Sequence, residues 1–301
     1  MAGSLVLIMI HGVTGGRWGP YLAPVLVPLA RALPFQALLF LPLLPFADLV
    51  FPWAFEPRPE IGGAVARYYL NIPSFVIRSV LVLVIWCVLS ILFAWRPGVT
   101  PLSAAFGLIV YAITATLAAI DWAMSIEPRF SSTAFGAAFA VAQILGALAV
   151  AGIWFCRRTR SGGTSDHGGL LLATLLGFAY LQFMQFLVIW AGGLPEKMAW
   201  YVLRASGPWN EMIVAAIVVG LVIPFVLLLP TRLRNRARTL GLASGLVLVG
   251  LILFWRWQMA DLHPAQPFGV SDIAGLAGFG ALLSGWTLRQ FWMKRGGRRD
   301  E

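Results

Sequence analysis

Long apolar runs separated by short polar turns are the feature that most constrains this chain. Of its 301 residues, 59% are hydrophobic and only 11% are charged, whereas soluble domains carry about a quarter charged residues. So few charges cannot cover a water-exposed surface of this size. Runs of about 20 apolar residues match the thickness of the hydrocarbon core of a bilayer. The sequence therefore predicts an integral membrane protein.

The apolar runs predict an all-α protein with about nine transmembrane helices in a single membrane domain over residues 1–301, ending in a basic tail at 294–301. The first run contains Gly15 and Gly16, which interrupt helices, so it is either one kinked span or a short span followed by a surface helix. The Gly- and Ser-rich segment 161–169 is expected to be a flexible link. The expected helices lie at 3–30, 34–52, 74–95, 101–123, 132–156, 168–191, 208–229, 237–258 and 271–293.

The basic residues predict the orientation, because positively charged turns of membrane proteins face the cytoplasm. Fourteen of the 22 Lys and Arg residues fall on one side of the expected spans. This places the N-terminus in the periplasm and the C-terminus in the cytoplasm of a multi-pass protein of the bacterial inner membrane. Because the net charge of +10 follows the turns, no nucleic-acid partner is expected. The fourteen are Arg31, Arg96, Arg157, Arg158, Arg160, Arg232, Arg234, Arg236, Arg238, Arg289, Lys294, Arg295, Arg298 and Arg299.

The Cys and His residues argue against a redox centre within this chain. The two cysteines, Cys87 and Cys156, are far apart and belong to no CxxC or CxxCH motif, whereas iron–sulfur clusters need about four cysteines. A b-type haem needs axial ligands, and of His11, His167 and His263 only His11 falls in an expected span. We therefore expect no metal site and no covalently bound cofactor.

Ionisable residues within the expected spans are candidates for function, because each one is costly in lipid. A carboxylate at this depth can pair with an arginine and hold helices together. It can equally pass protons or hydrogen-bond a quinol headgroup. The residues in question are His11, Arg17, Asp48, Arg78, Asp121, Glu211 and Arg256.

Two amides in the expected sixth helix form a polar stripe. Gln182 and Gln185 are three residues apart and stand beside Tyr180, Phe183 and Phe186. Amides that hydrogen-bond carbonyl oxygens and rings that stack are suited to a quinone. Hydrogen bonding between helices is the alternative explanation.

Four stretches carry a family resemblance. DWAMSIEPRFSSTAFG at 121–136 resembles the DWxMSLxPxWxSTxFG signature of the ActF membrane protein of alternative complex III, a bacterial quinol:electron-acceptor oxidoreductase. QFLVIWAGGLPEKMAWYVLRASGPW at 185–209 is similar to the family's QFxIIWxGNLPEExxWYxxRxxGGW. Two shorter stretches, HGVTGGRW at 11–18 and YLNIPSFVIR at 69–78, are similar to HHxTGxxW and YLNxPFFxxR. The four motifs follow one another in the family's order.

The resemblance implies a fold of the NrfD/PsrC type, with two four-helix bundles in the membrane. It implies as partners a related membrane subunit with the quinol site, a multihaem cytochrome c and an iron–sulfur subunit. The chain itself would have no redox centre and would support quinone binding or proton movement. The residues expected to touch a proton or quinol near the outer face are Asp121, Glu127, Glu196 and Arg204, and the deeper quinone-binding candidates are His11, Gln182 and Gln185. Asp121 would accept a proton, Arg204 would be a charge partner, and the glutamines would donate hydrogen bonds.

The chain departs from the family pattern at protonatable positions. Gly12 replaces the second histidine of HHxTG, Arg129 a histidine, Lys197 the second acid of LPEE, and Gly193 an asparagine. These departures favour an alternative, a non-catalytic accessory or assembly subunit of a terminal oxidase complex. A secondary transporter is a third interpretation. Against it, the chain shows no clear internal repeat and its charges cluster at one face.

Overall fold

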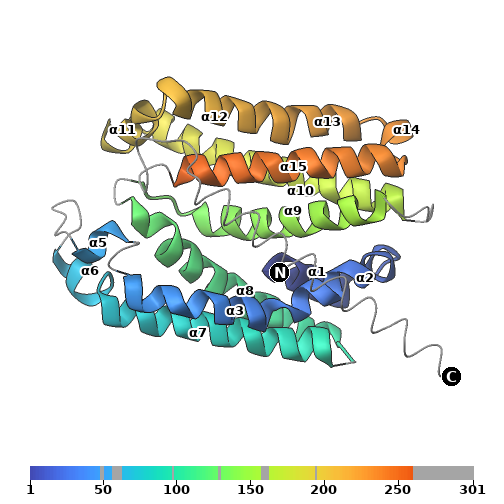
Figure 1. The fold of residues 1–301 in the computed structure, drawn as a ribbon, viewed down its shortest axis with the longest axis horizontal. Helices are drawn as coiled ribbons and strands as arrows, with labels where there is room; N and C mark the ends of the chain where they lie inside the picture. The colour runs from blue at the N-terminus through green and yellow to red at the C-terminus, as the bar shows by residue number, and fades with distance from the viewer. Residues whose placement is uncertain are drawn as a thin grey trace.

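The computed structural model describes residues 1–47, 51–55, 63–96, 98–127, 130–156, 163–193 and 195–259. Within these ranges every regular element is helical (Figure 1). Seven helical stretches are long and apolar enough to cross a membrane, which indicates a multi-pass membrane protein. They are Trp18–Phe46, Ile72–Trp95, Pro101–Ile126, Phe135–Cys156, Thr164–Ala191, Gly207–Leu228 and Ala237–Gln258.

Three spans are single α-helices and four combine several helical elements. The single helices are α9 (Phe135–Cys156), α10 (Thr164–Ala191) and α15 (Ala237–Gln258). The combined spans consist of α2 (Trp18–Arg31), α3 (Leu33–Phe40) and η1 (Leu41–Phe46); α7 (Ile72–Ser90) and η2 (Ile91–Trp95); α8 (Pro101–Trp122) and η3 (Met124–Ile126); and α12 (Gly207–Ile217), η4 (Val218–Val222) and α13 (Ile223–Leu228). Shorter helices are α1 (Ala2–Thr14), α5 (Pro52–Phe55), α6 (Gly63–Tyr68), α11 (Pro195–Leu203) and α14 (Thr231–Arg234).

The spans form two groups with α9 between them. On one side α9 packs against α1 and α8. α7 packs against α8, and α3 packs against α7. On the other side α9 packs against α10 and α15, and α15 in turn packs against α12, η4 and α13. Figure 1 shows the two groups as separate layers, blue to green and yellow to orange, with their axes roughly parallel.

Small residues allow α9 to pack closely against both groups of helices. Ala138 and Ala142, four residues apart as expected for a packing stripe, are buried. Gly3 of α1 lies directly on the backbone of α9 at Gln143, where a side chain of any size would overlap the carbonyl group. Lipid offers little hydrophobic gain when helices associate, so such close backbone contact is a main source of their attraction.

The closest helix crossing in the second group also depends on glycine. Gly220 in the π-helical element η4 faces Gly250 of α15, and a Cβ added to either would overlap the backbone of the other. Pro224 is the second residue of the next element, α13, and cannot donate the regular helical hydrogen bond. This accounts for the local widening of the helix at η4.

Contacts between the turns define one end of the bundle. Arg234 of α14 lies against Gly168 near the start of α10, and Gly163, just before α10, lies against Tyr21 near the start of α2. The turn at 15–17 therefore lies at the same end as the arginine-rich turn at 229–236. Because successive spans alternate in direction, Trp53, Ser125 and Arg204 belong to the opposite end.

The expected first helix over residues 3–30 is wrong as a single span. Gly15 and Gly16 have φ values of 67° and 100°, a left-handed conformation that favours glycine and ends α1 at Thr14. The chain then reverses, and Gly19 of α2 packs against the ring of His11. α1 begins inside the bundle and is too short to cross the membrane, while the run Trp18–Phe46 makes the crossing.

Two further expectations need correction. Arg31 was placed in a turn but lies within the first span, where its Nε donates a hydrogen bond to the Ala94 carbonyl at 2.8 Å. His167 was placed in a flexible link but is helical and fully buried, because α10 begins at Thr164. In both cases a polar side chain reaches a backbone carbonyl inside the bundle, a contact that hydropathy does not reveal.

The expected helix at 34–52 is also wrong as a separate span, because its described part up to Phe46 is the second half of the crossing Trp18–Phe46. The expected spans at 74–95, 101–123, 132–156, 168–191, 208–229 and 237–258 are confirmed to within a few residues at their ends. The count of about nine is not confirmed, because the described part of the chain contains seven candidate spans and the half-length α1. The expected helix at 271–293 and the basic tail at 294–301 lie outside the described residues.

Replacing Gly250 with alanine is expected to lower thermal stability, because the added Cβ would force the backbones of η4 and α15 apart. Overpacking of this kind costs about 1–3 kcal/mol. The measurement is thermal unfolding of the purified protein in detergent micelles, followed by tryptophan fluorescence. Gly245→Ala on the same helix is the matched control, since nothing lies within 4 Å of its added Cβ. Equal melting temperatures for the two variants would contradict the close contact.

Candidate functional site

A cavity of about 490 Å³ lies in the second group of helices, between α10, α12 with η4, and α15. Its volume falls within the range of about 300–1,000 Å³ that is common for ligand pockets. α10 packs against α13 and α15. The cavity lies between α10 and α12, and residues of both helices line it. The lining comes from α9, α10, α11, α12, η4 and α15 and from the connections around α11.

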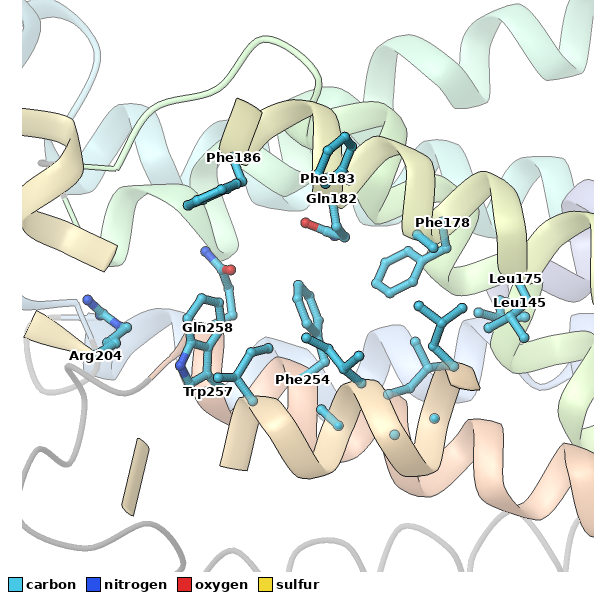
Figure 2. A pocket seen from close by; sticks show the side chains of 18 of the residues that line it. Leu145, Leu175, Phe178, Gln182, Phe183, Phe186, Arg204, Phe254, Trp257 and Gln258 are labelled. Carbon is cyan, nitrogen blue, oxygen red and sulfur yellow. The ribbon is translucent and has the colours of Figure 1, made fainter. Parts of the chain in front are cut away.

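The cavity is polar at one end and apolar at the other (Figure 2). Arg204 and Gln258 lie at the end formed by the helix termini, and Gln182 points inward from α10. Leu145 and Leu175 lie at the opposite end, near the middle of α9 and α10. This arrangement suits an elongated ligand with a polar head and an apolar body. The aromatic side chains of the lining are Phe130, Phe178, Phe183, Phe186, Tyr201, Phe254 and Trp257.

The two predicted glutamines form one hydrogen-bonded unit. Gln185 is buried, and its Nε2 donates to the Leu181 carbonyl at 3.3 Å and to Oε1 of Gln182 at 3.0 Å. Gln182 lines the cavity, whereas Gln185 stands behind it. Both hydrogen bonds lie within α10 and do not join it to another helix. Gln182 faces the cavity and Gln185 positions it, and the role of the amides in quinone binding stays a prediction.

Arg204 closes the polar end from the segment after α11. Its Nη1 donates to the Trp200 carbonyl at 3.1 Å, and its guanidinium lies 4.1 Å from the centroid of the Trp200 ring. Tyr201, next to Trp200, also lines the cavity, and burial raises the pKa of its hydroxyl to about 12. The Tyr201 hydroxyl is therefore protonated at neutral pH and can donate a hydrogen bond.

Asp121 lies in the first group of helices, away from the cavity. Nε and Nη2 of Arg78 donate to its two carboxylate oxygens at 2.8 and 3.1 Å, and the Asp121 side chain is only 2% exposed. Arg78 also donates to the Tyr69 carbonyl and stacks over the Tyr69 ring at 3.8 Å. The carboxylate joins α7 to α8.

The surroundings of this ion pair hold it in place. Ser125 donates to the Asp121 carbonyl at 2.6 Å and accepts a hydrogen bond from the Trp53 indole at 3.1 Å. Burial and the nearby Asp121 charge raise the pKa of Tyr69 to about 12, so Tyr69 carries no charge at neutral pH. Two of the seven ionisable residues named for the spans, Arg78 and Asp121, thus form one helix-linking pair.

The remaining predicted site residues do not join these two places. His11 contacts the Gly16 carbonyl at 3.0 Å and packs edge-to-face on Trp18, at the opposite end of the bundle. Glu127 lies partly buried in the loop after η3 and is not part of the cavity wall. Glu196 lies on α11, and its side chain is outside the described part of the protein.

Sequence reasoning missed the contribution of α15. Phe254, Trp257 and Gln258 line the cavity opposite Gln182 (Figure 2). Gln258 is an amide at the end of an otherwise apolar run, preceded by two tryptophans within three residues, which could have marked it as a candidate. Gln182, which lies across the cavity from Gln258, is 76 positions earlier in the chain. The periodicity of a sequence does not indicate contacts between residues so far apart.

No protein-family model matches the chain, and no curated protein matches it. Its function is therefore inferred from the geometry of the cavity and of the Arg78–Asp121 pair.

Removing one partner of the ion pair is expected to destabilise the protein strongly. Asp121→Ala would strand the Arg78 guanidinium among apolar helices, at a cost of about 3–5 kcal/mol. The double variant Arg78→Met/Asp121→Leu should recover much of this loss. Thermal unfolding in detergent measures both, with Arg67→Met at an exposed position as the control. A double variant no more stable than Asp121→Ala would argue against the pairing.

Proposed function

We propose that this chain is a membrane subunit, without a redox centre of its own, of a respiratory quinol:electron-acceptor oxidoreductase of the alternative complex III type. Its cavity would bind the quinone. The observation that carries the proposal is the cavity itself, with amides and an arginine at one end and aliphatic residues at the other. A quinone needs hydrogen bonds at its ring carbonyls and apolar surroundings for its tail.

Contacts among the motif residues support the family resemblance. Tyr69 and Arg78 from one motif meet Asp121 from another. His11 and Trp18, both in the first motif, pack edge-to-face with ring centroids 5.1 Å apart. These contacts give a physical reason for the residue types at the motif positions, which are far apart in the sequence.

The longest motif, residues 185–209, forms part of the wall of the cavity. Phe186, Tyr201 and Arg204 line it, and Gln185 holds the amide of Gln182. The stretch that most resembles the ActF family therefore contributes to the polar end of the candidate binding site.

The bundle and its charges support the remaining parts of the proposal. Two groups of helices on either side of α9 are compatible with the paired bundles of the NrfD/PsrC type. The arginine-rich turn at 229–236 would face the cytoplasm of a bacterium, and the polar end of the cavity would then face the periplasm.

The proposed partners are a related membrane subunit with the quinol site, a multihaem cytochrome c and an iron–sulfur subunit. This chain would support quinone binding or proton movement beside them. A second candidate function is an accessory or assembly subunit of a terminal oxidase complex. The departures at Gly12, Arg129, Gly193 and Lys197 favour this second candidate, because each replaces a polar or protonatable residue of the family pattern.

Purification of the tagged chain under mild detergent is expected to bring down a multihaem cytochrome c and an iron–sulfur subunit, because a chain without a redox centre can act only beside them. Mass spectrometry identifies the partners, and the haem spectrum of the eluate gives a second readout. The untagged strain is the control. Elution with haem–copper oxidase subunits would support the second candidate, and elution of the chain without any respiratory subunit would contradict both.

A further inference from the structure

The cavity opens to the outside of the bundle between α10 and α12. Within the described part of the chain α10 packs against α13, the continuation of α12, but not closely against α12 itself. Two of the side chains that line the cavity are also exposed, Phe183 on α10 by 58% and Ile217 on α12 by 46%. Side chains that border both the cavity and the outer surface mark an opening between the two. We call Phe183 and Ile217 the mouth of the cavity.

The surface around the mouth is apolar. Leu176 of α10 is 44% exposed and Val218 of η4 is 43% exposed, and neither lines the cavity. The segments 168–191 and 212–229, which form the two sides of the opening, contain no Asp, Glu, Lys, Arg or His. Exposed apolar side chains on uncharged helices of a membrane protein face lipid. The mouth therefore opens toward the hydrocarbon layer.

The position of the mouth along the helices agrees with this direction. Phe183 is eight residues from the end of α10 at Ala191, and Ile217 is ten residues from the start of α12 at Gly207. At about 1.5 Å per residue, both lie roughly 12–15 Å along their helices from the same end of the bundle. A hydrocarbon layer is about 30 Å thick, so the mouth lies near its middle. The polar end of the cavity at Arg204 is closer to the membrane surface.

We infer that the cavity exchanges its ligand directly with the bilayer, through the mouth at Phe183 and Ile217. The inference rests on the proposed function for the identity of the ligand, a quinone dissolved in lipid. The apolar tail of a quinone favours lipid over water, so an entrance within the hydrocarbon layer admits the molecule without passage through water. Because the two mouth residues stand at the entrance, they control the rate of exchange more than the affinity.

The first test measures how fast a bound quinone leaves. The tagged full chain is held on affinity resin in detergent micelles, loaded with tritiated decylubiquinone and washed with an excess of the unlabelled compound, and the retained radioactivity is followed over time. Ile217→Trp narrows the mouth and should slow release on the order of tenfold, the effect of a barrier higher by about 1.4 kcal/mol. Phe183→Ala widens the mouth and should speed release. The dissociation constants should change much less than these rates.

Each mouth variant has a matched control on the same span. Val218→Trp places the same ring beside Ile217 but outside the cavity, and Leu176→Ala removes an exposed side chain two turns from Phe183. Both controls should release the quinone at the wild-type rate. Melting temperatures show whether each variant is folded, and all four positions are exposed, so the changes leave the core intact. Equal release from Ile217→Trp and Val218→Trp would place the entrance elsewhere and overturn the inference.

The second test needs no quinone. A phosphatidylcholine that carries a diazirine in its acyl chain is included in nanodiscs with the full chain, and the residues labelled after illumination are identified by mass spectrometry. Val247 of α15 lines the cavity and is only 1% exposed, so an acyl chain can reach it only by entering the cavity. We expect Val247 to be labelled. Ala243, one turn away on the same helix and buried outside the cavity, is the control and should not be labelled.

The two tests separate failure of the inference from failure of the proposed function. Equal labelling of Val247 and Ala243 would show that lipid does not reach the cavity, and would overturn the inference whatever the quinone does. Labelling of Val247 by a chain that binds no decylubiquinone would support the mouth and remove the quinone from the proposed function.

Discussion

The absence of water from the hydrocarbon layer governs this structure. A polar group there must find its partner within the protein or remain unsatisfied at a cost. Backbone groups meet this condition through helices, and several polar side chains meet it through specific contacts. Arg31 caps the Ala94 carbonyl, His167 reaches the Leu148 carbonyl at 2.8 Å, and Arg78 pairs with Asp121. Other buried polar atoms have no partner among the described residues, and two of them, Gln182 Nε2 and Trp257 Nε1, belong to residues that line the cavity.

The surroundings of Asp121 and of Gln182 differ in how completely their polar groups are hydrogen-bonded. Around Asp121 both carboxylate oxygens are occupied, the neighbouring serine is bonded twice, and the four elements α5, α7, α8 and η3 are tied together. Around Gln182 one amide nitrogen and one indole N–H have no acceptor among the described residues. Completed networks stabilise a fold, whereas an incomplete network beside a void is suited to an incoming molecule.

Hydropathy was sufficient to predict most of the spans, because each apolar run is about as long as a bilayer is thick. It could not predict the reversal at Gly15 and Gly16, since two glycines permit both a kink and a turn and only the packing of α1 against α9 decides between them. For the site, the spacing of Gln182 and Gln185 and the motif around Arg204 were correct guides to the cavity wall. The contribution of Gln258 depends on how α15 crosses α10, which no local pattern encodes.

The contact between Gly220 and Gly250 has a consequence for the shape of the cavity. The helices that cross at this contact move apart on either side of it. Both glycines line the cavity, so part of its wall is bare backbone at the apex of a wedge. No side chain can be introduced at the apex, whereas residues farther along, such as Ile213 and Phe254, can change in size. Ligand preference could therefore be adjusted at the wide end while the helix crossing itself stays unchanged.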